Sequence, residues 1–144
     1  MLAMDSPAAT AGTPTAASKA ALLCECPRTA THETTVCGVL TRFVLTAYSN
    51  RIFVVVSQTQ NMGTLIHASA DNPIDAATGS FTTRVLIGKR DDDHLEVYAR
   101  TMCELICRRA PDAGPLLLAI SIQGAHSNEM FRGILKEVEE HRVW

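Results

Sequence analysis

The sequence predicts an α+β domain, with a mainly antiparallel sheet of about six strands and two helices packed on one face of it. Two observations lead to this prediction. Short apolar or alternating runs separated by turn residues fill the first part of the domain, as is typical of strands. Residues 91–109 and 128–141 instead carry apolar side chains at helical spacing, and one strand-like run lies between them. Strands followed by helix–strand–helix indicate helices layered on a sheet.

The composition is that of one ordinary globular domain. The chain has 144 residues, of which 47% are hydrophobic and 19% are charged, which is enough to form one core. The net charge of -2 gives no electrostatic basis for binding nucleic acid or an anionic membrane surface. No apolar run approaches the roughly 20 residues that a helix needs to span a bilayer.

Residues 1–20 differ in composition from the rest of the chain. They are rich in Ala, Thr, Ser and Pro and contain no aromatic residue. We therefore predict a disordered tail, followed by a folded domain over residues 21–144. The tail has no apolar core after a basic start, so it does not resemble a secretory signal peptide. Because the number of cysteines is also odd, five, we expect a cytoplasmic protein that is also present in the nucleus.

The first half of the domain is expected to consist of strands. Residues 21–26 are a short apolar run that ends at a proline, which predicts an edge strand, and residues 28–33 are expected to form a loop. Residues 34–67 predict a three-stranded antiparallel meander. Its first turn is expected at residues 49–50 and its second within residues 58–61.

The middle strand of this meander, residues 52–56, is five apolar residues in a row. A strand with one wet face alternates apolar and polar residues, so this strand is expected to be covered on both faces. Helices are expected to cover one face of the sheet, and a second copy or a related subunit covers the other most simply. The dimer-interface candidates are therefore Phe53, Val54, Val55 and Val56.

The remaining elements follow in order. Residues 68–80 form the longest connection without secondary structure, and loops of this length are usually functional or mobile. Residues 81–87 predict a strand, and residues 91–109 a helix with acidic residues at its start and arginines at its end. Residues 116–122 predict a buried strand, and residues 128–141 a final amphipathic helix.

Cysteines are the residues that an enzyme hypothesis would depend on. Cys24, Cys26 or Cys37 beside His32 or His67 in a cleft would be a candidate nucleophile or metal site. Their spacing matches no zinc motif, however, and no recognisable nucleophile motif joins them. We therefore expect neither a catalytic site nor a bound metal.

Other chemistry-bearing residues have simple structural explanations. Cys103 and Cys107 are four residues apart in the first predicted helix and are expected to be buried on its inner face. The acidic residues 91–93 are explained by a helix start, and the five histidines are scattered and expected at the surface. No glycine-rich phosphate-binding motif occurs, and we expect no cofactor.

Two segments of the chain resemble a known family. Residues 36–66, VCGVLTRFVLTAYSNRIFVVVSQTQNMGTLI, are similar to the core of proteasome assembly chaperone 3, in which a VCGV start, a VVV strand and a KMGTLV-like strand occur in this order. Residues 135–144, LKEVEEHRVW, resemble its closing helix with a terminal Val-Trp. The likeness covers residues 35–144.

The resemblance implies a non-catalytic chaperone that promotes assembly of the alpha-subunit ring of the 20S proteasome. It would act as a heterodimer with an assembly chaperone 4-like subunit, with a homodimer as the other possibility, and leave before the particle matures. Asp71, Asn72 and Asp75 in the long loop are the candidates for contacting a proteasome alpha-type subunit, although a variable surface loop is the simpler interpretation. A dimeric scaffold of another pathway and a small cysteine-dependent enzyme are the alternative functions.

Overall fold

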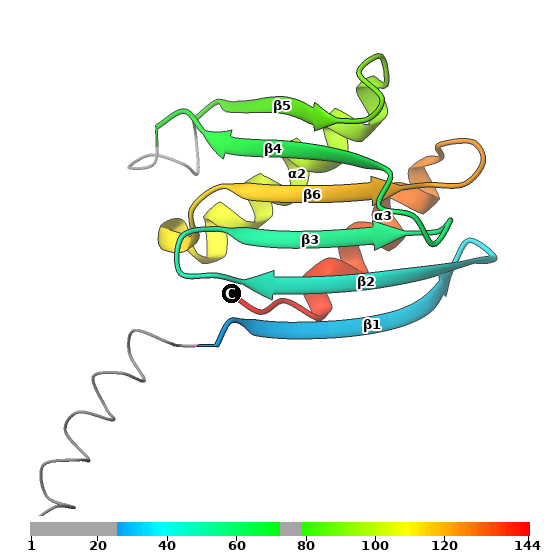
Figure 1. Ribbon diagram of the computed structural model, residues 1–144, viewed down its shortest axis with the longest axis horizontal. Helices are drawn as coiled ribbons and strands as arrows, with labels where there is room; N and C mark the ends of the chain where they lie inside the picture. Colours follow the sequence, from blue (N-terminus) through cyan, green and yellow to red (C-terminus); the bar gives the residue numbers. More distant parts are fainter. Residues whose placement is uncertain (1–25, 73–78) are drawn as a thin grey trace, which may run out of the picture.

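One six-stranded sheet with two helices on one side of it forms the folded domain (Figure 1). The computed structural model describes residues 26–72 and 79–144. The strands are β1 (Arg28–Val36), β2 (Val39–Ala47), β3 (Ile52–Ser57), β4 (Thr64–Ala70), β5 (Phe81–Ile87) and β6 (Leu116–Ser121). The helices are α2 (Asp93–Arg109) and α3 (Asn128–Glu140), with a short 3-10 helix η2 (Pro111–Ala113). The predicted α+β architecture is confirmed. The predicted tail, residues 1–20, lies outside the described residues.

The strands lie in the order β1-β2-β3-β6-β4-β5. All neighbouring pairs are antiparallel except β3 and β6, which run parallel. The predicted meander is therefore correct for β2 and β3 but wrong for β4, because β6 lies between β3 and β4. A continuous apolar run such as LLLAIS is typical of a strand with neighbours on both sides. The long connection at residues 58–63 lets the chain pass over one strand position, which a two-residue turn does not allow.

The edge strand β1 is a second departure from the prediction. Residues 28–33 were expected to form a loop, and residues 21–26, of which only Cys26 is described, an edge strand. Threonine and valine favour strands, and in β1 they alternate between the two faces of the sheet. A two-residue turn at Cys37 and Gly38, both with positive φ (50° and 80°), joins β1 to β2. Such turns match the twist of a hairpin.

The core lies between the sheet and the helices. Leu45, Val54, Leu118 and Ile66 stand side by side in the register of four neighbouring strands, and all four are 0% exposed. The helices close this layer with buried side chains: Leu95, Tyr98, Met102 and Ile106 from α2, and Met130, Ile134 and Val138 from α3. Asp92 and Ser127 cap the two helices by accepting hydrogen bonds from backbone N–H groups. No helix of the described residues is long and apolar enough to cross a membrane.

The connection between β3 and β4 is fixed at both of its ends. Gln58 is buried; its Nε2 donates to Thr41 Oγ1 at 3.0 Å, and its Oε1 accepts from the backbone N–H of Gln123 at 2.8 Å. Gly63 has a φ of 71°, and a Cβ at this position would lie 2.2 Å from the carbonyl oxygen of Ile120. Only glycine therefore fits where the chain enters β4.

Candidate interaction surface

Helices α2 and α3 pack on the same face of the sheet, and no helix of residues 26–72 or 79–144 lies on the opposite face, which is toward the viewer in Figure 1. The strand register brings apolar side chains together on that face. Val44, Val55, Ala119 and Leu65 form one row across β2, β3, β6 and β4. Phe53 and Leu117 form part of the next row. We call these six residues the open face.

The open face is only half-buried. Val44, Phe53, Val55, Leu65 and Leu117 each retain partial exposure, because they cover one another and no second layer of the described residues lies above them. Rows of β-branched and aromatic side chains of this kind are typical of sheet faces that pack against another sheet.

The structure divides the four predicted dimer-interface residues between the two faces. Val54 and Val56 are 0% exposed beneath the helices, so they belong to the core and are not surface residues. Phe53 and Val55 alternate with them and lie on the open face. The run is continuously apolar because β3 contributes apolar side chains both to the core and to the open face. This corrects the prediction for Val54 and Val56, while for Phe53 and Val55 an interface role stays a prediction.

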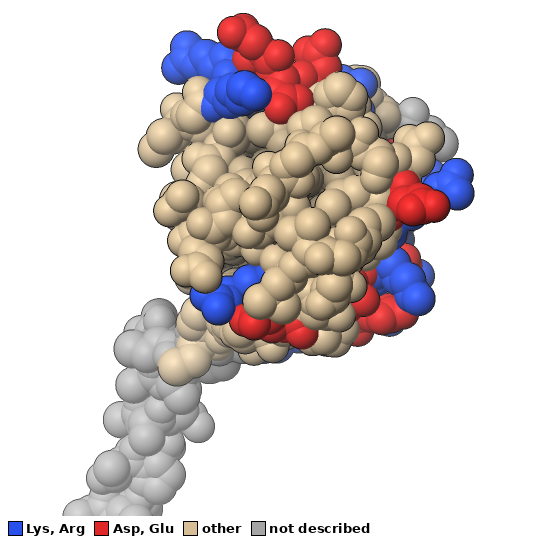
Figure 2. Space-filling model, turned by 90° about the vertical axis from the view of Figure 1, so that its right-hand side faces the viewer, with Lys and Arg blue, Asp and Glu red and all other residues tan. Residues whose placement is uncertain are grey.

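One end of the open face leads into a cavity of about 390 Å³, whose lining includes Leu40, Val55 and Met62. Leu40 and Met62 are each more than half exposed. On its polar side, Arg42 Nε donates to Glu33 Oε2 at 3.0 Å across the first two strands. Figure 2 views the molecule from this end and shows a broad area without charged side chains between charged groups at its upper and lower margins. The uncharged surface thus continues around the end of the sheet, where the cavity lining includes the polar residues Gln60, Asn61 and Gln123 as well.

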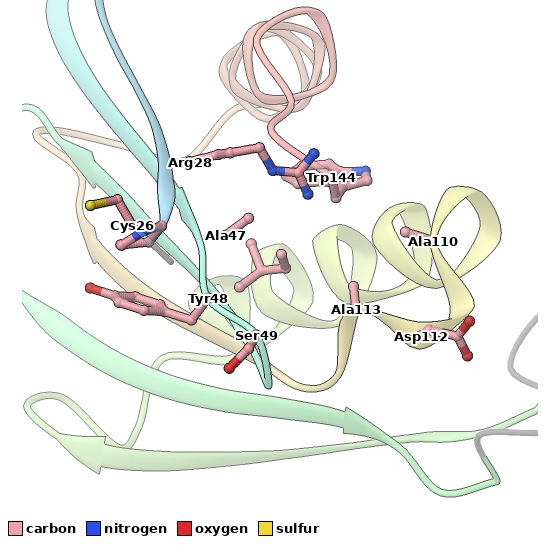
Figure 3. Close-up of a pocket in the computed structure, with 11 residues that line it drawn as sticks. Cys26, Arg28, Ala47, Tyr48, Ser49, Ala110, Asp112, Ala113 and Trp144 are labelled. Atoms are coloured by element: carbon pink, nitrogen blue, oxygen red, sulfur yellow. The ribbon is translucent and has the colours of Figure 1, made fainter. Parts of the chain in front are cut away.

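A second cavity, of about 440 Å³, lies at the opposite end of the sheet. It is lined by the start of the edge strand, the β2–β3 turn, the η2 region and the C-terminal residue (Figure 3). Figure 3 shows the side chains of Arg28 and Trp144 directed toward one another, with Tyr48 on the other side of the cavity. Trp144 packs against the core, while its Nε1 is buried without a hydrogen-bond partner. Sequence reasoning did not find this cavity, because no pattern links residues so distant in the chain.

Two of the three predicted loop residues are described. Asp71 and Asn72 are exposed at the end of β4, and Asp75 lies outside the described residues. The carboxylate of Asp71 accepts hydrogen bonds from the hydroxyls of Ser80 and Thr82, which lower the pKa of that carboxyl. Asp71 therefore joins the two ends of the loop, a structural role that its sequence position did not indicate.

Cys26 and Cys37, two of the thiols considered for a metal site, do not come together. Cys26 and Cys37 are both exposed and lie beyond opposite ends of the nine-residue β1. At about 3.4 Å per residue the strand separates them by roughly 30 Å. These two thiols and His32, which lies in the middle of the strand, cannot bind one ion. Cys24 lies outside the described residues.

Cys103 and Cys107 are buried on the inner side of α2, as predicted. Burial, and to a smaller extent the neighbouring Cys107, raises the pKa of Cys103 to about 12. Burial also raises the pKa of the Cys107 thiol. A nucleophilic cysteine needs a lowered pKa, so both thiols have the electrostatics of structural residues.

The histidines were expected singly at the surface, and the structure instead places four of them in two stacked pairs. His32 and His141 have ring centroids 3.8 Å apart, and His94 and His126 have centroids 4.7 Å apart. Each pair also contacts one carboxylate, Glu137 in the first case and Asp92 in the second.

Asp92 is the more constrained of these two carboxylates. Burial raises its pKa, but the charge and hydrogen bond of His126, the backbone N–H of His94 and the charge of Lys89 together outweigh burial. The net effect is a pKa below the ordinary value. Of these contacts between histidines and carboxylates, the sequence indicated only that of Glu137 with His141, through their i,i+4 spacing.

Comparison with known proteins decides the family. The sequence profile described as proteasome assembly chaperone 3 matches residues 54–141. The mouse protein called proteasome assembly chaperone 3 is 34% identical over 110 residues, covering 76% of this chain and 88% of its own length. The one from Nematostella vectensis is 38% identical over 114 residues, covering 73% and 82% respectively.

The chain belongs to the proteasome assembly chaperone 3 family. Its fold also resembles a chain in the crystal structure of a novel chaperone complex for yeast 20S proteasome assembly. That likeness has a TM-score of 0.64 at 15% identity and covers 79% of this chain and 98% of the other, so it shows a shared fold. Membership of the proteasome assembly chaperone 3 family confirms the resemblance found in the sequence and implies a chaperone rather than an enzyme.

Proposed function

We propose that this protein is a non-catalytic chaperone that promotes assembly of the alpha-subunit ring of the 20S proteasome. Membership of the proteasome assembly chaperone 3 family supports the pathway. The observation that carries the mechanism is the open face, an apolar sheet surface that no other layer of the described residues covers. Such a surface suits a protein that acts by binding other proteins.

The open face is proposed to bind a second, small chaperone subunit of the assembly chaperone 4 type. Its rows of Val44, Val55 and Leu65, with Phe53 and Leu117 beside them, would be removed from water when a similar sheet packs on it. A second copy of this chain would satisfy the same apolar surface, so a homodimer is the competing arrangement.

The proteasome alpha-type subunits would then bind the paired chaperones. Asp71, Asn72 and Asp75, in the loop after β4, are the proposed contacts, because recognition residues often lie on loops held by a rigid scaffold. Release before maturation follows if later subunits compete for the same surface, since a chaperone shifts assembly only through differential affinity for its stages. The proposed location is the cytoplasm, and also the nucleus.

The test is affinity purification of the full-length tagged protein from its own cells at low salt, with the bound proteins identified. Val55→Lys on the open face is compared with Val97→Lys, a matched control on the outer surface of α2 where the valine is 51% exposed. We expect the unaltered protein and the control to retain a small companion and proteasome alpha-type subunits. Val55→Lys is expected to lose the companion, because a lysine ammonium would be placed in an apolar interface.

Two results would contradict the proposal. A companion retained equally by Val55→Lys and by the control would remove the open face as the interface. A companion found without any proteasome subunit would favour the alternative of a dimeric scaffold in another pathway. Circular dichroism of both variants checks that each one is folded before it is compared.

A further inference from the structure

Three potential metal ligands meet where the edge strand passes the end of the last helix. Glu137 and His141 are one turn apart at the C-terminal end of α3, and His32 projects from the helix-facing side of β1. His32 Nε2 lies 2.9 Å from Glu137 Oε2, and His141 Nδ1 lies 3.7 Å from the same oxygen. The side chain of His32 is only 28% exposed, that of Glu137 21% and that of His141 34%.

These separations are close to those in a tetrahedral metal site. Zinc–nitrogen and zinc–oxygen bonds of about 2.0–2.1 Å place neighbouring ligand atoms roughly 3.3 Å apart. The two measured distances lie on either side of that value, and the ligand atoms of the three residues all lie within 4.8 Å of one another. The rings of His32 and His141 are stacked with an interplanar angle of 18°, so both would have to turn for their in-plane nitrogen lone pairs to point at one ion. His141 Nδ1 also lies 3.0 Å from the Glu137 carbonyl oxygen and would leave that contact to bind metal.

The charge around Glu137 also favours a cation. Of the three glutamates at the end of α3, Glu139 pairs with Arg109 and Glu140 with Lys136. Among the described residues, the ion-pair partners of Glu137 are His32 and His141, and both of them are potential metal ligands themselves.

The position of Glu137 in the helix adds to this. The last turn of α3 contains no basic residue, although the C-terminal end of a helix carries a partial negative charge that favours cations. Arg142 follows the helix, but its guanidinium donates to the carbonyl oxygen of Glu139 rather than to the Glu137 side chain.

We propose that His32, Glu137 and His141 form a binding site for a transition-metal dication of the Zn²⁺ type. Two imidazoles and one carboxylate are ligands that Zn²⁺ takes in proteins, and they leave one position for water. The ion would connect β1, the edge strand, to the helix layer, and would stabilise the folded state in proportion to the logarithm of its concentration above Kd.

The second histidine pair is a weaker candidate and provides the control. Asp92 already uses its Oδ1 to cap α2 through the His94 backbone N–H, and Lys89 Nζ lies 3.9 Å from its Oδ2. A lysine ammonium beside the carboxylate competes directly with a metal ion. In addition, the His94 side chain is 67% exposed, so its position is less fixed by neighbouring residues than that of His32 or His141.

The test is titration of the full-length protein with Co²⁺, whose visible spectrum reports its ligands, followed by competition with Zn²⁺. We expect one equivalent of Co²⁺ with nitrogen and oxygen ligands and no thiolate charge-transfer band, which excludes binding at exposed cysteines such as Cys26 and Cys37. Glu137→Gln and His141→Asn should each weaken binding at least about 100-fold, since even losing a partner of a ligand costs 10–100-fold. His94→Asn should leave binding unchanged.

A second measurement keeps the result independent of spectroscopy. Saturating Zn²⁺ should raise the Tm of the unaltered protein and of His94→Asn, but not that of Glu137→Gln or His141→Asn. Thermal unfolding without metal verifies that each variant folds. The proposal is overturned if no ion binds, if the bound Co²⁺ shows thiolate ligands, or if the Glu137 and His141 variants bind as tightly as the unaltered protein.

Discussion

Val54 and Val55 are neighbours in the chain, yet the structure assigns them to opposite sides of the sheet. Val54 is 0% exposed beneath the helices, whereas Val55 lies on the open face and lines the cavity at its end. The same substitution, valine to alanine, should therefore have two different effects. This pair tests the facing of β3, on which both the core and the proposed interface depend.

The magnitude for Val54→Ala follows from its burial. The substitution removes two methyl-sized groups from a fully enclosed site. At about 0.8 kcal/mol of burial free energy for each, this costs about 1.6 kcal/mol. The cavity left behind adds about 1 kcal/mol if the surroundings do not collapse into it. We therefore expect a loss of about 2–3 kcal/mol, equivalent to a fall in Tm of roughly 6–15 °C for a domain of this size.

Val55→Ala should cost less than about 1 kcal/mol in the isolated chain, because this side chain is already in partial contact with water. The assay is urea unfolding of both variants at low protein concentration, where self-association does not contribute, repeated at high concentration. At high concentration only Val55→Ala is expected to differ further from the unaltered protein, and only if the chain pairs with itself.

Equal destabilisation by the two substitutions at low concentration would refute the assignment of faces. A larger effect of Val55→Ala would reverse it and place the core on the other side of β3. A change in the slope of free energy against urea would instead mean that the compactness of one state had changed, and the comparison would then be made from Tm.

Three further predictions follow from individual residues. Gly63→Ala should abolish stable folding or cost several kcal/mol, whereas Gly38→Ala, which also has positive φ but no atom within 4 Å of its Cβ position, should cost about 1 kcal/mol by thermal unfolding. Asp92 has a lowered pKa when folded, so it stabilises above its ordinary value of 3.8 and loses that effect as the pH falls through its folded pKa; Asp92→Asn should show a smaller loss in urea titrations from pH 6 to pH 3. Alkylation at pH 8 followed by mass spectrometry should modify the exposed Cys37 and leave the buried Cys103 unmodified until the protein unfolds.

The sequence predicted the layers of the fold better than the order of its strands. Alternating residues located β2 and β5, continuous apolar runs located β3 and β6, and helical spacing located both helices. The strand-like residues before His67 also located the first part of β4. Strand order depends instead on contacts between distant segments. The continuous apolar run of β3 is also typical of a strand with a parallel neighbour, and β6 provides that neighbour. Residues 28–33 were missed as part of β1 because their alternation is between polar threonines and small or polar residues.

The candidate surface was predicted only in part, for a related reason. Five apolar residues in a row do not show which of them face the helices, and only the pairing with Phe43 and Leu45 places Val54 and Val56 in the core. The histidine sites were not predictable, because His32 and Glu137 come from opposite ends of the domain and meet only when the sheet and α3 pack together.

The two edges of the sheet carry charged side chains that disfavour the addition of another strand. An exposed edge strand is a template for adding another strand, and proteins block it with charged side chains. The edge strand β1 carries Arg28 and Glu33, and the opposite edge, β5, carries Arg84, all of them exposed. Pairing along either edge would bring these charges against the partner strand. The six residues of the open face form an apolar centre, and Glu33, Arg42 and Arg84 border it on the same side of the sheet. An associating sheet is therefore expected to pack face to face over this apolar centre, at about 10 Å, rather than to extend the sheet.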